Sequence, residues 1–277
     1  MGRIAKKFEE LGRRKEGALI CFTTAGYPSL NLTLPVLRAL SKHADILELG
    51  LPFSDPIADG PIIQTSSQKA LEGGMNPALL FKIIKEFRRE EETPLLVLSY
   101  YNPVFQLGPK RFAEELSRAG GDGLIVPDLP VEEAGELSGT LSSLNLDLVL
   151  LAAPTSHAPR LRKICENSRG FVYLVSVLGV TGARKEVSKG LGELIRRIKR
   201  FSKVPVAVGF GVSQPQHVRE ILAWGADGVI VGSSLIERMA GNLHPPHQML
   251  KRLEDFASQL KRATRPKILT QVRGSES

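Results

Sequence analysis

The regular alternation of short apolar runs with helix-patterned segments constrains the fold of this chain more than any other feature. The runs are almost continuously hydrophobic, as expected for parallel strands covered on both faces. Between them, apolar residues recur at the helical spacing. This alternation predicts a parallel sheet with right-handed crossovers, and eight such units in 277 residues predict a closed (β/α)8 barrel. The predicted strands are Ala18–Phe22, Ile46–Leu49, Leu95–Leu98, Leu124–Val126, Leu146–Leu151, Val172–Val175, Val204–Val208 and Val229–Val231.

An additional amphipathic helix is predicted over residues 3–14, before the first strand. The helical segments between strands include Leu34–Leu40, Leu79–Phe87, Phe112–Leu116, Leu161–Cys165, Leu191–Ile198 and Val218–Ala223. A faint internal repeat places a small residue and an aspartate just before a strand, at Asp45, Asp122 and Asp227. We expect one barrel domain over residues 1–264, followed by a basic and polar tail, 265–277, that is frayed.

The composition is that of an ordinary soluble globular protein, with 42% hydrophobic and 24% charged residues. No apolar run approaches the length of a membrane span, and the first residues lack the apolar core of a signal peptide. Two cysteines, Cys21 and Cys165, do not form a disulfide framework. A reducing cytoplasm is therefore the expected location, without a membrane association.

The net charge of +8 could indicate a nucleic-acid partner. The basic residues, however, occur as separate pairs on helix-patterned segments, where solvated helix faces explain them. Aromatic residues are few, at 6%, and no stacking-and-basic motif appears. We therefore expect no nucleic-acid partner, and an anionic small substrate fits the charge equally well. The pairs are Lys6-Lys7, Arg88-Arg89, Arg196-Arg197, Lys199-Arg200, Lys251-Arg252 and Lys261-Arg262.

The second predicted strand and the loop after it contain the candidate catalytic groups. Glu48 interrupts an apolar strand, and Asp55 and Asp59 follow in a long loop that contains several prolines and glycines. A carboxylate within an apolar strand is costly to bury unless it is paired or used, and a second carboxylate is suited to acid–base chemistry. We expect a raised pKa for Glu48 because of desolvation. The alternative is an edge-strand glutamate facing water beside two turn-capping aspartates.

In barrels of this class the active site lies at the carboxyl ends of the strands. Glycine-rich turns follow the last two strands, at Gly209–Gly211 and at Gly232–Ser234, and each leads into a helical segment. This placement predicts a phosphate site, although tight turns alone could also require glycine. Residues 176–185 form a glycine-containing stretch that could be a mobile lid. No clustered ligand spacing indicates a metal, and no dinucleotide or P-loop motif is present.

Residues 47–64, LELGLPFSDPIADGPIIQ, resemble the signature of the tryptophan synthase α subunit family. The further motifs PDLPVEE at 127–133, GVTG at 179–182, VGFG at 208–211 and Gly232-Ser233 follow in the family's order, so that the resemblance covers residues 1 to about 260. It implies a lyase without metal or organic cofactor. This lyase splits indole-3-glycerol phosphate into indole and glyceraldehyde 3-phosphate and passes the indole to a β subunit in an α2β2 complex.

The resemblance also implies roles for individual residues. Glu48 would be the catalytic acid/base, and Asp59 would hold the indole N–H. Some relatives carry an arginine in the stretch that here reads Val177-Leu178, so the sequence departs from them there. Three further groups of residues would surround the substrate or face the partner. They are an indole pocket of Phe22, Leu98, Ile125, Tyr173 and Phe210; a phosphate site of Gly182, Gly211, Gly232 and Ser233, with Thr181 closing onto Asp59; and loops facing the β subunit that contain Pro52, Asp55, Pro56, Asn102 and Pro103.

Two other functions remain open from the sequence. A different phosphate-binding barrel enzyme, such as a sugar-phosphate epimerase or aldolase, would share the turns after strands seven and eight. It would give no reason for the Glu48–Asp59 pair, and a Schiff-base aldolase would need a strand lysine that none of the runs contains. A non-catalytic partner that only activates a β subunit would not need Glu48.

Overall fold

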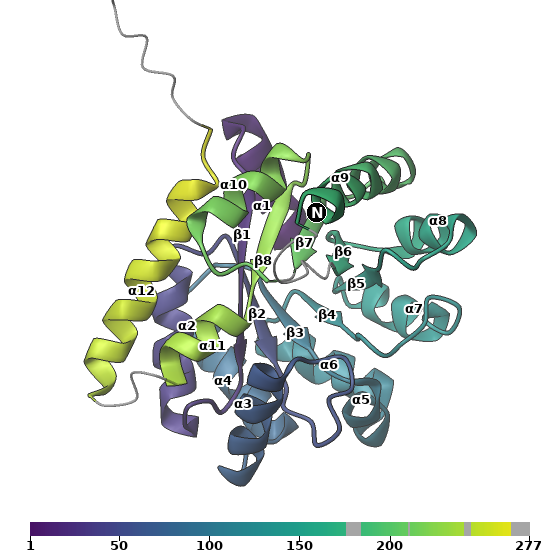
Figure 1. Ribbon diagram of the computed structural model, residues 1–277. Coiled ribbons are helices and arrows are strands. Elements are labelled where there is room, and N and C mark those ends of the chain that lie inside the picture. Colours follow the sequence, from purple (N-terminus) through teal and green to yellow (C-terminus); the bar gives the residue numbers. More distant parts are fainter. Residues whose placement is uncertain (176–183, 210, 241–244, 267–277) are drawn as a thin grey trace, which may run out of the picture.

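The chain folds as a closed barrel of eight parallel strands, each hydrogen-bonded to its neighbours in sequence order and β8 to β1 (Figure 1). The predicted fold is thereby confirmed. The computed structural model describes residues 1–175, 184–209, 211–240 and 245–266, without the side chains of residues 184–189. The strands are β1 (Ala18–Thr24), β2 (Ile46–Gly50), β3 (Leu95–Leu98), β4 (Gly123–Ile125), β5 (Asp147–Ala152), β6 (Val172–Val175), β7 (Val206–Gly209) and β8 (Gly228–Val231).

The strand bounds differ from the predicted ones by at most two residues, and the differences have local causes. Strand β7 begins after Pro205, because proline has no N–H to donate to the ladder. Strand β1 continues through the two buried threonines Thr23 and Thr24, which the apolar pattern could not include. The Thr24 hydroxyl shares a 2.7 Å hydrogen bond with Ser66, so the strand end is tied to the helix that follows β2.

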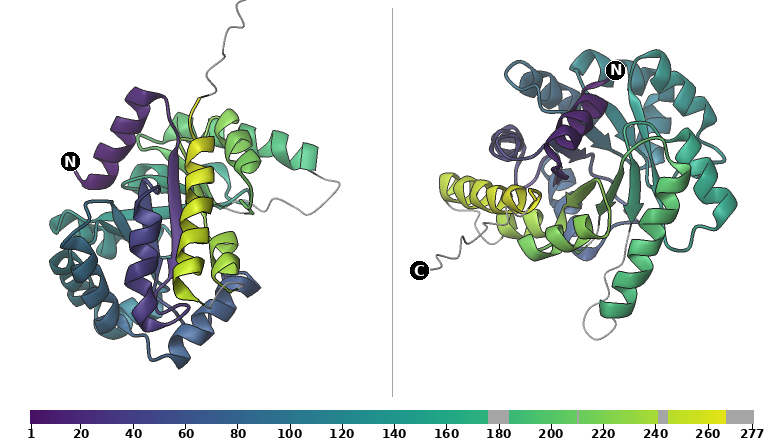
Figure 2. Two further views of the ribbon diagram at one scale, coloured as in Figure 1. Left: turned by 90° about the vertical axis from the view of Figure 1, so that its left-hand side faces the viewer. Right: turned by 90° about the horizontal axis from the view of Figure 1, so that it is seen from above.

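Helices surround the barrel on the outside, and α12 packs along β1 between α10 and α2 (Figures 1 and 2). The loop after β2 ends at Gly60, because Pro61 begins α3. Most of the stretch expected to form a lid, 176–183, lies outside the described residues, and its last two residues belong to α9. The helices are α1 (Arg3–Arg14), η1 (Leu30–Leu32), α2 (Thr33–Ser41), α3 (Pro61–Glu72), α4 (Pro77–Arg88), α5 (Tyr101–Leu107), α6 (Pro109–Ala119), α7 (Gly135–Ser143), α8 (Ala158–Asn167), α9 (Arg184–Phe201), α10 (Pro215–Ala223), α11 (Ser233–Ala240) and α12 (Pro246–Ala263).

The predicted lead-in helix α1 closes the amino-terminal end of the barrel. Its buried side chains Ile4, Phe8 and Leu11 belong to the same apolar cluster as the inward-facing strand residues. The rings of Phe8 and Phe171 lie 5.9 Å apart. Because α1 fills this end, the opposite end, where the strands terminate, is the one available for chemistry. We call that end the mouth of the barrel.

The repeated aspartates bind the backbone of the preceding strand at the amino-terminal end. Asp45 accepts the N–H of Leu19 at 2.8 Å, Asp122 that of Leu95 at 2.8 Å, and Asp227 that of Val206 at 2.9 Å. Each also pairs with a basic side chain: Lys261, Arg88 and Lys199, respectively. Ser168 occupies the corresponding position before β6 and accepts the N–H of Leu150 at 3.1 Å. The repeated aspartates therefore serve to stabilise the barrel.

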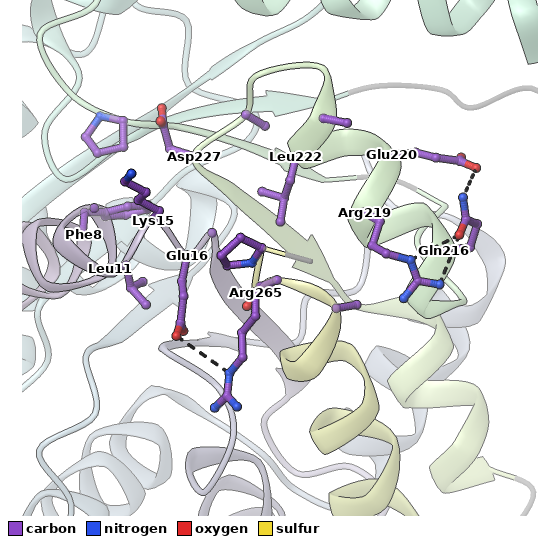
Figure 3. Close-up of a pocket in the computed structure, with 18 residues that line it drawn as sticks. Phe8, Leu11, Lys15, Glu16, Gln216, Arg219, Glu220, Leu222, Asp227 and Arg265 are labelled. Atoms are coloured by element: carbon purple, nitrogen blue, oxygen red, sulfur yellow. Dashed lines mark hydrogen bonds and ion pairs between the residues drawn. The ribbon is translucent and has the colours of Figure 1, made fainter. Parts of the chain in front are cut away.

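A cavity of about 680 Å³ opens at this amino-terminal end, between α1, α10 and the end of α12 (Figure 3). Phe8, Leu11 and Leu222 form part of its lining, and the ion pair between Glu16 and Arg265 lies at its edge. None of the predicted site residues lines it. The predicted site residues that the structure describes lie at the mouth instead.

Candidate active site

Glu48 points into the barrel from β2. It follows Ile46, a member of the inner apolar cluster, by two residues, so both side chains lie on the inward face of the strand. The residue is 1% exposed, and Oε2 has no hydrogen-bond partner among the described residues. Burial and the nearby charge of Asp59 raise the pKa of Glu48 to about 8, which confirms the predicted direction. The alternative of a water-facing edge residue is wrong.

Asp59 lies half-buried in the loop between β2 and α3, and Tyr100 holds it there. The Tyr100 hydroxyl donates to Oδ2 of Asp59 at 3.1 Å and accepts the N–H of Ala58 at 2.9 Å. The ring of Phe53 stacks on Tyr100 with centroids 5.4 Å apart. Burial raises the pKa of Asp59 to about 6, although the Tyr100 hydrogen bond acts in the opposite direction. Both carboxyl groups are therefore partly protonated near neutral pH.

Tyr100 is a site residue that the sequence analysis missed. It directly follows Ser99 after β3, so its place at a strand's carboxyl end was visible, but a tyrosine there gives no specific signal by itself. Leu151 is a second omission. It pairs in register with Tyr173 and packs against the inner apolar cluster, at the same level of the barrel. Period-two counting from Val149 would have placed Leu151 inside.

Apolar side chains surround the two carboxyl groups. Phe22 pairs in register with Glu48, and Leu98 and Tyr173 pack half-buried on the inner cluster. The charges of Glu48 and Asp59 both contribute to raising the pKa of the Tyr173 hydroxyl, after burial, so this hydroxyl lies close to both carboxyl groups. Ile125 is fully buried. The residues predicted to line the apolar pocket thus lie on β1, β3, β4 and β6, while Phe210 lies outside the described residues.

Glycines at three strand ends leave room for the two aromatic rings. A Cβ on Gly209 would lie 2.5 Å from the Tyr173 hydroxyl, one on Gly50 2.8 Å from the Phe22 ring, and one on Gly232 3.2 Å from the same ring. Contacts below 3.0 Å are not tolerated without movement. These glycines thus have a packing role inside the mouth, which the sequence analysis did not predict.

The turns after β7 and β8 are joined by a buried hydrogen bond. The Ser234 hydroxyl donates to the carbonyl oxygen of Val212 at 2.8 Å. Gly211 has a φ of 64°, the left-handed region that favours glycine. Helix α11 begins at Ser233, directly after Gly232, so its first N–H groups have no acceptor within the helix. These features match an anion-binding pair of turns; Thr181 and Gly182 lie outside the described residues.

The predicted partner-facing residues lie beside the mouth, on the loop after β2 and on α5. Asp55 and Asn102 are exposed, Pro56 and Pro103 are half-buried, and Pro52 is buried. The expectation of a loop is wrong for Asn102 and Pro103, which lie in the first turn of α5. The same two segments carry Ile57 and Phe105, whose side chains are 83% and 62% exposed. Apart from Met1, these are the exposed large apolar side chains of the described residues.

Within the described ranges, no group of three or more His, Cys, Asp or Glu side chains is placed to hold a metal ion. None of the helices in these ranges is long and apolar enough to cross a membrane. His157 caps α8, because its Nδ1 accepts the N–H of Arg160 at 3.3 Å.

Comparison with known proteins gives one consistent family. The model of the tryptophan synthase alpha chain family matches residues 8–265. The tryptophan synthase alpha chain of Prochlorococcus marinus strain MIT 9313 is 47% identical over 238 residues, 86% of each chain, and that of Methanocaldococcus jannaschii is 46% identical over 236 residues, 85% of this chain and 84% of the relative.

Solved structures agree in fold over nearly the whole chain. Tryptophan synthase subunit alpha from Legionella pneumophila superposes with a TM-score of 0.88 at 34% identity, covering 95% of this chain and 98% of that one. A chain of the tryptophan synthase α2β2 complex from Pyrococcus furiosus superposes with a TM-score of 0.82 at 43% identity, covering 88% and 98%.

Proposed function

Since this chain belongs to the tryptophan synthase alpha chain family, we propose that Glu48 and Asp59 together catalyse the cleavage of indole-3-glycerol phosphate at the mouth of its barrel. The enzyme is a lyase that releases indole and glyceraldehyde 3-phosphate in tryptophan biosynthesis. Family membership overturns the alternative of a sugar-phosphate epimerase or aldolase of another family. The burial of Glu48, whose Oε2 has no hydrogen-bond partner among the described residues, is the observation that carries the assignment of its role.

Glu48 acts first as an acid. With a pKa of about 8, its carboxyl group is largely protonated at neutral pH and can donate a proton to C3 of the indole ring. The bond between C3 and the glycerol chain then breaks as the adjacent hydroxyl loses its proton and becomes the aldehyde. Glu48, now a carboxylate, accepts that proton and is restored for the next turnover.

Asp59 stabilises the charge that develops on the ring. Protonation at C3 makes the indole a cation, and a carboxylate that accepts the ring N–H interacts with this charge mainly along the reaction path. With a pKa of about 6, Asp59 is largely ionised at neutral pH. The hydrogen bond from Tyr100 holds its Oδ2 in a fixed position, so little reorganisation is needed during the reaction.

The remaining predicted residues bind the two ends of the substrate. Phe22, Leu98, Ile125 and Tyr173, with Phe210, form the apolar pocket for the indole ring. Gly211, Gly232 and Ser233, with Gly182, bind the phosphate through backbone N–H groups, and Thr181 closes onto Asp59. The hydrogen bond between Ser234 and Val212 supports this role, since it keeps the two phosphate turns at a fixed separation.

The exposed surface beside the mouth binds a tryptophan synthase β subunit in an α2β2 complex. Pro52, Asp55, Pro56, Asn102 and Pro103 lie in or beside this surface. The exposure of Ile57 and Phe105 on the same segments supports the assignment, because exposed apolar side chains that gather on one surface mark interaction sites.

The test is indole release from indole-3-glycerol phosphate by the purified chain and by Glu48→Gln, each with and without a β subunit. We expect slow release by the wild type, acceleration by the partner, and a loss of at least about 10²-fold in the variant. If the wild type releases no indole even with the partner, the chain is the non-catalytic partner of the remaining alternative.

A further inference from the structure

The segment that contains helices α8 and α9 carries the whole net positive charge of this protein. Residues 158–203 contain twelve Lys and Arg and three Asp and Glu, a balance of +9, whereas the complete chain has +8. All other segments together therefore have a balance of −1. Helices α8 and α9 contact each other on the outside of the barrel (Figure 1). We call the exposed surface of residues 158–175 and 190–203 the α8–α9 face.

The basic side chains of this face are exposed, and most have no acidic partner. Arg160 pairs with Glu132 and Lys199 with Asp227, while the guanidinium carbon of Arg162 lies 5.0 Å from the centre of the Phe201 ring, across the two helices. Within the described part of the chain, the side chains of five further basic residues form no ion pair or hydrogen bond. These are Lys163, Arg196, Arg197, Arg200 and Lys203.

These charges do not serve the substrate phosphate. Helix α9 runs from the end of β6 to the start of β7, so its last turns, with Arg196, Arg197 and Arg200, lie near the amino-terminal end of the barrel. The phosphate turns after β7 and β8 lie at the mouth, the opposite end. The alternative offered by the sequence, an anionic small substrate, therefore does not explain the charge of this face.

The chemistry of the face fits a polyanion rather than a protein or a lipid surface. Protein interfaces have an apolar centre, and membrane-binding helices insert apolar side chains. The exposed large apolar residues of the described ranges are Met1, Ile57 and Phe105, none of them on this face. Six of its nine described basic residues are arginines, and the guanidinium group matches phosphate oxygens in a bidentate geometry.

We propose that the α8–α9 face binds the phosphate backbone of nucleic acid without sequence preference. Two rigid helices present the cations on one side of the barrel, and each phosphate contact would release a condensed counterion. The pairs Arg196-Arg197 and Lys199-Arg200 look like isolated solvated positions in the sequence. In the folded chain α9 lies beside α8, and the contact of Arg162 with Phe201 places the last turn of α9 next to the arginines of α8.

The experiment is a fluorescence-anisotropy titration of a labelled mixed-sequence RNA duplex with the full chain at several salt concentrations. We expect dissociation constants of about 10⁻⁴ to 10⁻⁶ M near physiological salt, with affinity falling steeply as salt rises. The variant Arg196→Gln/Arg197→Gln/Arg200→Gln should bind at least roughly tenfold more weakly, with a logarithmic salt slope smaller by about 2 to 3. Its indole release should equal that of the wild type, which shows that the variant is folded and separates this test from that of the catalytic proposal.

The matched control is Lys82→Gln/Lys85→Gln/Arg111→Gln, which removes the same charge from exposed residues of α4 and α6. It should bind the duplex as the wild type does. The proposal is overturned if no salt-dependent binding occurs or if both triple variants lose affinity equally. Tighter binding of polyglutamate or of anionic phosphatidylserine vesicles than of the duplex would also overturn it, in favour of an acidic protein or a membrane.

Discussion

The hydroxyl of Tyr100 donates a hydrogen bond to Oδ2 of Asp59 at 3.1 Å, and this contact joins the end of β3 to the loop that follows β2. The same hydroxyl accepts the N–H of Ala58, so two neighbouring residues of the loop are held by one side chain. The proposed catalytic pair thus consists of one carboxyl group on a strand and one on a loop whose position depends on Tyr100.

Replacing Tyr100 by phenylalanine should lower kcat while leaving the barrel folded. The hydrogen bond from Tyr100 lowers the pKa of Asp59, so its loss should raise that pKa further above 6 and move the acidic limb of the pH–rate profile to higher pH. We expect a loss of about tenfold in kcat/KM at pH 7, which corresponds to about 1.4 kcal/mol in the activation free energy. Tyr101→Phe removes a neighbouring hydroxyl and serves as the control. An unchanged acidic limb in Tyr100→Phe would contradict the positioning role.

The pH dependence of indole release should show an alkaline limb from Glu48. Its protonated form is the active one, so kcat/KM should fall as pH rises through about 8, and it should also fall below about pH 6 as Asp59 becomes protonated. The substrate phosphate titrates near pH 6 and can distort the acidic limb, but it cannot produce the alkaline one. A profile flat to pH 9 would exclude Glu48 as the initial acid.

Stability gives a second test of the same pKa. The folded state keeps Glu48 protonated up to about pH 8, whereas the unfolded chain releases the proton near its ordinary value of 4.5. The folded state therefore binds more protons between these values, and the free energy of unfolding falls as pH rises from about 4.5 to 8. Glu48→Gln removes this loss, so urea unfolding should find the variant increasingly more stable than the wild type over this range. At pH 4 the two proteins should differ little in stability from this cause. A difference between them that stays constant from pH 4 to 8 would contradict the raised pKa of Glu48.

Gly209→Ala should damage the site through Tyr173. The added Cβ would lie 2.5 Å from the Tyr173 hydroxyl, inside the mouth, and overpacking of this kind costs about 1–3 kcal/mol. We expect a lower midpoint of urea unfolding and weaker binding of an indole analogue. Tyr173→Leu in the same chain removes the clashing ring, so the double variant should be less destabilised than the sum of the single variants. Gly190→Ala, where a Cβ meets no atom within 4 Å, is the control.

The sequence predicted the barrel and the buried Glu48 because each depends on local pattern: an apolar run, or a carboxylate within it. The phosphate role of the glycine-rich turns after β7 and β8 stays a prediction. Other features depend on contacts between distant segments. The hydrogen bond of Tyr100 to Asp59 and the reason for glycine at position 209 require the register of neighbouring strands. The start of β7 after Pro205 was predictable from the missing N–H of proline, and the apolar pattern alone overlooked it.

Removing Asp122 should destabilise the barrel without affecting the chemistry. Its carboxylate accepts the N–H of Leu95 and pairs with the largely buried Arg88, so Asp122→Ala leaves an unpaired charge and an unpaired donor, at a cost of about 3–5 kcal/mol in the free energy of unfolding. Because the site lies at the other end of the barrel, kcat of the folded variant should be unchanged. Asp255→Ala, on the exposed face of α12, should change stability by less than about 0.5 kcal/mol.

The surface formed by Ile57 and Phe105 should control binding of the β subunit. Both side chains are exposed in the isolated chain, and they lie on the loop that carries Asp59 and on the helix that follows Tyr100. Burying them in a complex would remove apolar area from water, so Ile57→Ser and Phe105→Ser should each weaken the complex by about 1–3 kcal/mol, as measured by calorimetry. Because the same segments fix Asp59, loss of the partner should also remove the acceleration of indole release.

The basal rate without partner should stay at the wild-type level, since neither side chain belongs to the catalytic pair. Met1→Ser, at the third exposed apolar residue of the described ranges, should bind the partner normally, and weakening by all three substitutions alike would assign the effect to general surface hydrophobicity.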